Sequence, residues 1–381
     1  MAGLLLFLKS IGLVLAAFSA LYQQLTMPVE LGNPAQAAYP EQWYARSVWD
    51  LALEDGVLYA GCGDYAENSG PATIWSCDLS TGVWSEAIGT QDESVARFVT
   101  VNGKLFAPGI DSTVPTWSWG NCYYLQQGQW QMFTKVPGAV HNFDIAEHGE
   151  KIYFALGTSN GEDSPVLVTD DSMRSFHQVP FYREGEAVFP VAGDSYSRVY
   201  DFFKLKDTLY CLFRLYTESD KSGYQIYRLE EEGFCYVADT EGLSVTGIRQ
   251  IPVGGKVQVA DACYIATGNL YRTEDFQTFT QITLPDGGRV TDLIAQKNPL
   301  FENEVLYILS SAPQPDGTYQ VRIYARYSDY LTLPVVRCTA TCPALSFVKD
   351  GRDFYIGFGG GKEETADVGR IIKIRARCKM R

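Results

Sequence analysis

Four segments of the chain repeat one pattern at a nearly constant spacing. Each has an alternating strand, a tight turn and a second apolar strand with Leu or Ile followed by an aromatic residue. The anchor residues Leu58, Leu105 and Ile152 are 47 residues apart, and Leu209 follows 57 residues later. A period near fifty residues is typical of a repeat fold. The segments are VWDLALEDGVLYAG (48–61), ARFVTVNGKLFAPG (96–109), NFDIAEHGEKIYFALG (142–157) and VYDFFKLKDTLYCLF (199–213).

Three weaker copies follow, at 247–260, 290–310 and 344–359. In every copy a loop leads to a third strand, and a fourth strand usually ends the unit. Seven such units predict an all-β fold, a seven-bladed β-propeller of four-stranded antiparallel blades over residues 43–381, preceded by an N-terminal apolar helix. The last copy ends after its third strand, so we expect residues 41–47 to close the ring as an outer strand. A two-domain β-sandwich is the alternative, but it does not explain a constant period.

The first 25 residues are apolar apart from one lysine and a few polar residues. A stretch of this length fits either a signal peptide or a membrane anchor helix, and both place the remainder outside the cytoplasm, secreted or anchored. Residues 26–42, with prolines at 28, 34 and 40, indicate a linker.

Charge and cysteine content narrow the partners. A net charge of -14 and a pI near 4.7 argue against a nucleic-acid ligand. We expect a monomer that contacts a membrane only through its N-terminal segment. The nine cysteines stand singly in apolar runs, which predicts mostly reduced, buried thiols. A Cys62–Cys77 disulfide is the less favoured alternative, and the Cys338/Cys342 pair lacks partners for a zinc site.

Two segments resemble the Asp-box turn of sialidase-like (BNR) propellers: TDDSMRSF (169–176) and TEDFQTF (273–279). In that family the box is structural and holds the hairpin between the third and fourth strands of a blade, so the resemblance implies architecture and no chemistry. Both segments depart from the family pattern at its glycine, where the first has Met173. The sialidase catalytic set does not carry over. The first three units are also similar to uncharacterised bacterial propeller proteins with GDY-x-x-N-x-GP and GID segments, which again implies architecture alone.

One position of the repeat is charged in most units. Eight residues before each anchor, allowing an insertion in the copy at 290–310, stands a residue of the innermost strand, and these residues should form a ring around the central channel. Carboxylates and guanidinium groups there could pair between blades or bind a ligand at the channel mouth, and both interpretations stay open. The ring residues are Asp50, Arg97, Asp144, Asp201, Arg249, Asp292 and Ser346.

The ring gives four candidate catalytic carboxylates and several candidate cations. The carboxylates are Asp50, Asp144, Asp201 and Asp292. Three further cations, His141, Arg198 and Arg289, stand three residues before an Asp of the ring. With Arg97 and Arg249 they are the candidate cationic ligand-binding groups.

The connections between second and third strands should open on the same face as the ring. Long, uneven loops on a rigid scaffold often hold binding residues. Here they are acidic and aromatic, and the candidate ligand-binding residues are Asp64, Tyr65, Asn68, Asp111, Trp117 and Trp119. We expect no cofactor, although Ca²⁺ is conceivable at Asp64, Glu67 and Asn68.

Three functions fit this face. Aromatic rings beside carboxylates suit glycan or cell-envelope recognition by a binding module. Carboxylates at the channel mouth would serve a glycoside hydrolase or lyase. An acidic face would also dock a basic protein partner. No H-E-x-x-H and no phosphate-binding glycine loop occurs, so the sequence favours binding over catalysis.

Overall fold

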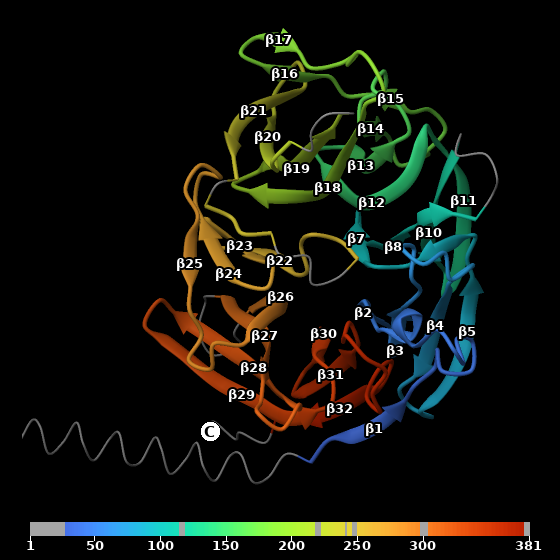
Figure 1. Ribbon diagram of the computed structural model, residues 1–381, viewed down its shortest axis with the longest axis vertical. Coiled ribbons are helices and arrows are strands. Elements are labelled where there is room, and N and C mark those ends of the chain that lie inside the picture. Colours follow the sequence, from blue (N-terminus) through green and yellow to red (C-terminus); the bar gives the residue numbers. More distant parts are fainter. Residues whose placement is uncertain are drawn as a thin grey trace, which may run out of the picture.

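The computed structural model describes residues 27–113, 119–217, 222–240, 242–245, 250–297 and 304–376. These residues form β-sheets arranged as a closed ring around a central axis (Figure 1). One short 3-10 helix, Trp43–Arg46, is the sole helical segment in these ranges, and no helix there is long and apolar enough to span a membrane. The apolar helix expected in residues 1–25 lies outside the described residues.

Five of the sheets are discrete four-stranded blades. The first contains β2 (Asp50–Glu54), β3 (Val57–Gly61), β4 (Thr73–Asp78) and β5 (Val83–Gly89). The second contains β7 (Val99–Val101), β8 (Lys104–Pro108), β10 (Trp119–Gln126) and β11 (Gln129–Pro137). Two more contain β22 (Lys256–Val259), β23 (Ala262–Ala266), β24 (Leu270–Thr273) and β25 (Thr280–Ile282), and β26 (Arg289–Lys297), β27 (Glu304–Pro313), β28 (Tyr319–Ser328) and β29 (Leu331–Ala340). The fifth contains β30 (Ala344–Asp350), β31 (Asp353–Phe358), β32 (Ile371–Arg375) and β1 (Val29–Gly32).

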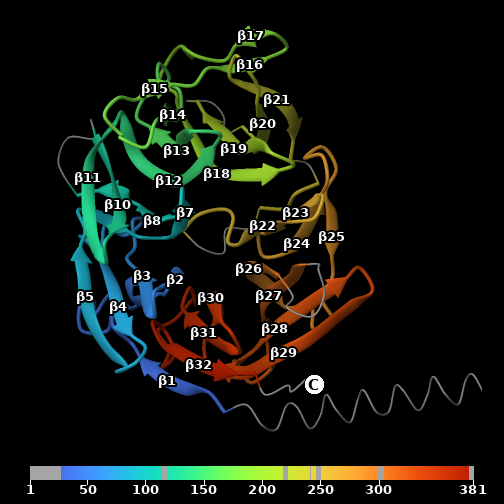
Figure 2. The same ribbon diagram turned by 180° about the vertical axis from the view of Figure 1, so that it is seen from behind.

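The sixth sheet has twelve strands. Its larger strands are β12 (Ala139–His148), β13 (Lys151–Thr158), β14 (Val166–Thr169), β18 (Tyr196–Leu205), β19 (Thr208–Tyr216), β20 (Gln225–Leu229) and β21 (Phe234–Asp239). Its short strands are β6 (Asp92–Ser94), β9 (Ile110–Ser112), β15 (His177–Gln178), β16 (Phe181–Arg183) and β17 (Glu186–Ala187). Figure 2 shows the ring from behind, with the larger strands of this sheet at the top.

The predicted division of the ring is therefore wrong. The β-propeller architecture is present, but with five discrete four-stranded blades rather than seven, because single bridges such as Gly157↔Arg198 join the remaining strands into one sheet. A side chain at Gly157 would place its Cβ 2.7 Å from His141 Cδ2, so glycine permits this approach of the strands. The sheet is also not wholly antiparallel, since β16 pairs with β21 in parallel.

A different segment from the expected one closes the ring. Residues 43–46 form the 3-10 helix, and β1 pairs antiparallel with β32 instead, with Glu30 opposite Ile372. The Trp84 indole N–H donates to the Leu31 carbonyl at 2.8 Å and so ties β1 to the first blade. The closing strand thus comes from within the segment that its prolines predict as a linker.

The centre of the ring is filled. The segment leading into β22 reaches across the centre in Figures 1 and 2, and it carries the fully buried Ile251 and Val253. These pack in one hydrophobic cluster with Trp49 of the first unit and Phe143 of β12. In the described chain, the centre of the ring is therefore packed with apolar side chains.

Two local predictions can be checked here. The eight described cysteines are free, and six of them are buried, as expected for apolar thiols; this excludes the Cys62–Cys77 alternative. The Asp-box-like segments form the turns from β14 to β15 and from β24 to β25, where Asp170 and Asp275 accept hydrogen bonds from backbone N–H groups two residues on, at 2.9 Å. Met173, which replaces the family's glycine, has a left-handed φ of 51°.

Candidate functional site

The ring carboxylates bind the backbone of the neighbouring unit. In each case the acceptor is a ring aspartate, and the donor is the N–H group that follows the ring residue of the next unit along the chain. Such a bond satisfies a buried acceptor and fixes adjacent innermost strands. The bonds are Asp50 Oδ2 to Phe98 N (2.8 Å), Asp144 Oδ2 to Phe202 N (2.7 Å) and Asp292 Oδ2 to Phe347 N (2.9 Å).

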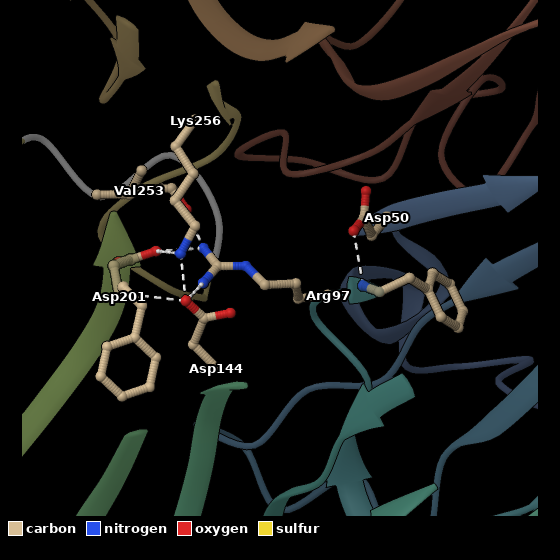
Figure 3. A network of polar contacts seen from close by, with 8 residues as sticks. Asp50, Arg97, Asp144, Asp201, Val253 and Lys256 are labelled. Atoms are coloured by element: carbon tan, nitrogen blue, oxygen red, sulfur yellow. Dashed lines mark hydrogen bonds and ion pairs between the residues drawn. The ribbon is translucent and has the colours of Figure 1, made fainter. Parts of the chain in front are cut away.

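Two ring carboxylates also form a buried ion network (Figure 3). Arg97 lies 2.5 Å from Asp201 and 3.3 Å from Asp144, and it donates to the Val253 carbonyl at 2.9 Å. Lys256 contacts both carboxylates, with Nζ 3.1 Å from Asp201 Oδ1. Two cations thus balance two carboxylates that are at most 1 % exposed.

The network engages two of the four predicted catalytic carboxylates, Asp144 and Asp201. Burial alone would raise the pKa of Asp144, but Lys256 and Arg97 outweigh it and lower that pKa. Asp50 and Asp292 use their second oxygen as well, each accepting from the next backbone N–H. All four carboxylates therefore act on the scaffold, which supports the structural interpretation of the ring.

A second set of residues lies at the mouth above the ring. A continuous row of β-bridges connects positions three residues before the ring residues, and it places several predicted ligand-binding residues side by side. We call Asp64, Tyr65, Glu93, Asp111, His141 and Arg198 the mouth cluster. The bridges are Gly63↔Ser94, Ser94↔Ile110, Ile110↔His141, His141↔Gly157 and Gly157↔Arg198.

Three carboxylates of the mouth cluster follow this row. Glu93 lies opposite Asp111, between the registered pairs Asp92↔Ser112 and Ser94↔Ile110, and Asp64 adjoins the Gly63↔Ser94 bridge. Burial, with added repulsion from Asp111 and Asp64, raises the pKa of Glu93 to about 7. Burial also raises the pKa of Asp64 and of Asp111. Among the described residues, neither Glu93 nor Asp111 forms an ion pair.

The cationic side of the mouth cluster is Arg198 with His141. Arg198 donates to the Tyr200 hydroxyl and to His141 Nε2, each at 3.3 Å, and its Nε is buried without a partner. Burial and the nearby Arg198 charge lower the pKa of His141 to about 3, so the imidazole is neutral. Because Nε2 accepts from Arg198, the ring proton belongs on Nδ1, which is also buried without a partner.

Tyrosine rings surround Arg198. Its guanidinium carbon lies 5.3 Å from the Tyr216 ring centre and 5.4 Å from that of Tyr196. The Tyr200 and Tyr216 hydroxyl oxygens are 2.7 Å apart. Among the described residues, no carboxylate lies within ion-pair distance of Arg198, although Asp111 is near enough to feel its charge.

The loop of residues 61–71 spans the mouth. The Tyr65 hydroxyl donates to the Gln250 carbonyl at 3.0 Å, and the Gln250 amide donates to Asp64 Oδ1 at 2.8 Å. The Tyr65 ring centre lies 5.8 Å from that of His141. The loop is therefore hydrogen-bonded to the segment that leads into β22, and Tyr65 lies beside His141 within the mouth cluster.

The other predicted ligand-binding residues lie elsewhere. Asn68 is exposed at the tip of the loop with a φ of 49°, Trp119 is 47 % exposed at the start of β10, and Arg289 is exposed at the start of β26. Trp117 and Arg249 lie outside the described residues. The described ranges hold no group of three metal-binding side chains, and Asp64 already accepts from Gln250 and from the Ala66 N–H. The conceivable Ca²⁺ site therefore has no support.

Sequence reasoning missed Glu93, Lys256 and Gln250. A signal for Glu93 existed, because the position three before ring residue Arg97 is Ser94, its direct neighbour. Lys256 and Gln250 lie in a degenerate copy of the repeat, and no repeat position marks them.

Comparisons with known proteins show the fold. No family model matches, and no curated protein matches. The chain is similar to virginiamycin B lyase from Staphylococcus aureus (12% identity, 92% of this chain, 98% of that chain, TM-score 0.52). The chain is also similar, at lower scores, to an alpha-L-arabinanase from Penicillium chrysogenum complexed with arabinobiose (12%, 92% and 98%, TM-score 0.44) and to BamB from Moraxella catarrhalis (12%, 86% and 96%, TM-score 0.39). The likeness to virginiamycin B lyase supports the β-propeller fold alone, and no comparison supports the sialidase-like family in particular.

Proposed function

We propose that the protein is a binding module that holds a glycan at the mouth cluster. The observation that carries this proposal is that charged side chains of both signs in the mouth cluster form no ion pairs among the described residues. Arg198 has no carboxylate partner in the described part of the chain, while Glu93 and Asp111 on the same row have no cation partner. The two sides of the mouth cluster are desolvated and yet do not neutralise each other.

A sugar ring suits both sides. Each hydroxyl group both accepts and donates, so neighbouring hydroxyls can accept from the Arg198 guanidinium and donate to Asp111 or Glu93. Tyr65 offers an aromatic ring at the same place, and aromatic faces pack against the C–H groups of sugars. A simple anion would gain from Arg198 but would be repelled by the carboxylates, so a neutral polyol is the better match.

A second candidate function is glycoside cleavage at the mouth cluster, and one observation favours it. Asp144 and Asp201 are held in the ion network, whereas Glu93 has a pKa raised to about 7 beside Asp64 and Asp111. A carboxyl group that can hold a proton near neutral pH, next to other carboxyl groups, suits general acid catalysis of glycoside hydrolysis.

A third candidate function is the docking of a basic protein, which the net charge of -14 motivates. For all three functions we propose a location outside the cytoplasm, on the composition of residues 1–25.

Glycan-array binding by the full chain tests the proposal. We expect binding to at least one glycan, with at least a tenfold loss in Arg198→Met and in Asp111→Asn. The matched control is Arg289→Met, because Arg289 is an exposed arginine at the start of another innermost strand. Absence of binding by folded protein would refute glycan recognition, and binding that survives Arg198→Met would place it elsewhere.

Release of reducing ends from the bound glycan separates the two candidates. A binding module leaves the glycan intact over hours. Turnover that is lost in Glu93→Gln, while binding is kept, would establish the hydrolase instead.

A further inference from the structure

A groove at the outer rim of the ring is independent of the mouth cluster. Its volume is about 640 Å³, and it lies between the first blade, β3 to β5, and the turn that joins β10 to β11. Figures 1 and 2 both show these elements next to one another on the outside of the ring. Pockets of about 300–1,000 Å³ accommodate small organic ligands.

The floor of the groove is one face of the first blade. Tyr59 is registered with Ser76, and Ser76 with Ser85, so the three side chains form a row across β3, β4 and β5. The hydroxyls of Ser76 and Ser85 lie 3.1 Å apart. This row offers two adjoining hydroxyls beside a phenol ring.

The wall of the groove is Trp130 with Gln129. Trp130 packs edge to face on Tyr59 at 5.4 Å between ring centres, and it is 8 % exposed. Its indole N–H is buried without a hydrogen-bond partner. The indole N–H signal of Trp130 therefore reports on what packs against this side chain. The exposed Gln129 amide stands next to it.

The charge of the lining defines the ligand class. No lysine, arginine or histidine lines the groove, so an anionic ligand has no counter-charge there. Asp78 is the one carboxylate, and it is already engaged by the backbone N–H and the hydroxyl of Ser80, at 2.8 and 2.6 Å. The groove therefore combines aromatic edges, hydroxyls and an amide with one carboxylate, which would repel an anionic ligand.

We propose that this groove is a subsite for a neutral saccharide of one or two rings. The exposed Val83 side chain and the accessible edges of Tyr59 and Trp130 supply apolar surface for the C–H groups of the sugar. The hydroxyls of Ser76 and Ser85 and the Gln129 amide bond to the remaining hydroxyls. The subsite stands on its own observations and does not depend on ligand binding at the mouth cluster.

The test follows the Trp130 indole N–H by NMR in full-length protein labelled with ¹⁵N-tryptophan. The signal is assigned by its loss in Trp130→Phe. Cellobiose, maltose, lactose and N,N′-diacetylchitobiose are titrated separately, up to about 50 mM, because lone sugar subsites bind in the millimolar range. We expect a saturable shift of this signal with at least one disaccharide.

Two variants make the result decisive. Ser85→Trp fills the groove from an exposed position of β5 and should abolish the shift, while Arg198→Met at the mouth cluster should leave it unchanged. If no sugar shifts the signal, or if Ser85→Trp leaves the shift intact, the proposal is wrong. A shift produced by extended peptides and by no sugar would also overturn it, in favour of a peptide that docks beside the β5 edge.

Discussion

The carboxylate of Asp50 accepts a hydrogen bond from the backbone N–H of Phe98, 48 residues further along the chain. The same relationship joins Asp144 to Phe202 and Asp292 to Phe347. A buried acceptor on each innermost strand thus fixes the strand that follows it in the ring. Removal of any one carboxylate leaves a backbone N–H without its partner, so these contacts should be measurable as stability.

Replacement of Asp292 by Ala should lower the free energy of unfolding by about 2 kcal/mol, since the buried N–H groups of Leu293 and Phe347 lose their acceptor. Chemical denaturation measures the change. Asp316→Ala is the control, because Asp316 is an exposed aspartate in the β27–β28 turn. Equal losses in both variants would contradict an inter-unit role for Asp292.

Replacement of Arg97 by Met should cost more, about 3–5 kcal/mol, because Asp144 and Asp201 would share Lys256 as their sole cation within the described network. The double variant Arg97→Met/Asp201→Asn should recover part of the loss, because it removes the excess charge. Additive losses in the double-mutant cycle would show that the two side chains do not interact.

Residues at equivalent positions of the repeat could be predicted from the sequence. The innermost strands share one register, so the position of Asp50 relative to Leu58 also locates Asp144 relative to Ile152 and Asp201 relative to Leu209, and Asp292 once an insertion is allowed. Contacts between the backbones of strands from different units do not follow from the repeat spacing. The Gly157↔Arg198 bridge, which helps to merge two groups of strands into one sheet, depends on a space that only glycine leaves open beside His141.

The mouth cluster could be predicted in part. Asp64, Tyr65, Asp111, His141 and Arg198 were placed on one face from strand order, and the structure brings them together along the bridge row. Glu93 lies in a three-residue strand, and its one sequence signal is that it adjoins Ser94, three residues before ring residue Arg97. The closing strand β1 is four residues long and has no alternating pattern, so the sequence favoured residues 41–47 instead.

Removal of β1 should open the ring. A chain that begins at residue 33 lacks the partner of β32 and the Leu31 carbonyl that accepts from Trp84, so we expect a loss of about 2 kcal/mol or more and a lower thermal midpoint. A chain that begins at residue 27 is the matched control. If both truncations melt at the same temperature, β1 does not close the ring in solution.

His141 should remain neutral at every pH at which the fold is stable. Its pKa is lowered to about 3 by burial and by Arg198, whereas an unfolded histidine titrates near 6.5. The unfolded state therefore takes up the proton first, and this group reduces stability as the pH falls from about 6.5 toward 3. NMR of the imidazole should show no titration between pH 8 and pH 5; a midpoint inside that range would contradict the buried Arg198 contact.

Glu93 should make the fold less stable as the pH rises. Its pKa is about 7 in the folded state against 4.5 for the free side chain, so between these values the folded state binds more protons than the unfolded state. Stability therefore falls with rising pH across this window, on the order of 2 kcal/mol in total. Glu93→Gln cannot ionise and should be the more stable protein at pH 8, with little difference at pH 4.

Ionisation of Asp92 also contributes to the pH dependence of stability, so the variant Asp92→Asn is needed to separate its contribution from that of Glu93. Burial raises the pKa of Asp92 to about 6, so its ionisation destabilises the fold in an overlapping window. The loss of stability with rising pH should be smaller in Glu93→Gln, smaller in Asp92→Asn and smallest in the double variant, which keeps the opposite contribution of His141. Denaturation midpoints at several pH values measure this series. A Glu93→Gln profile parallel to that of the unmodified protein would mean that Glu93 is ionised and solvated, and that the row of Asp64, Glu93 and Asp111 carries no proton to donate to a ligand.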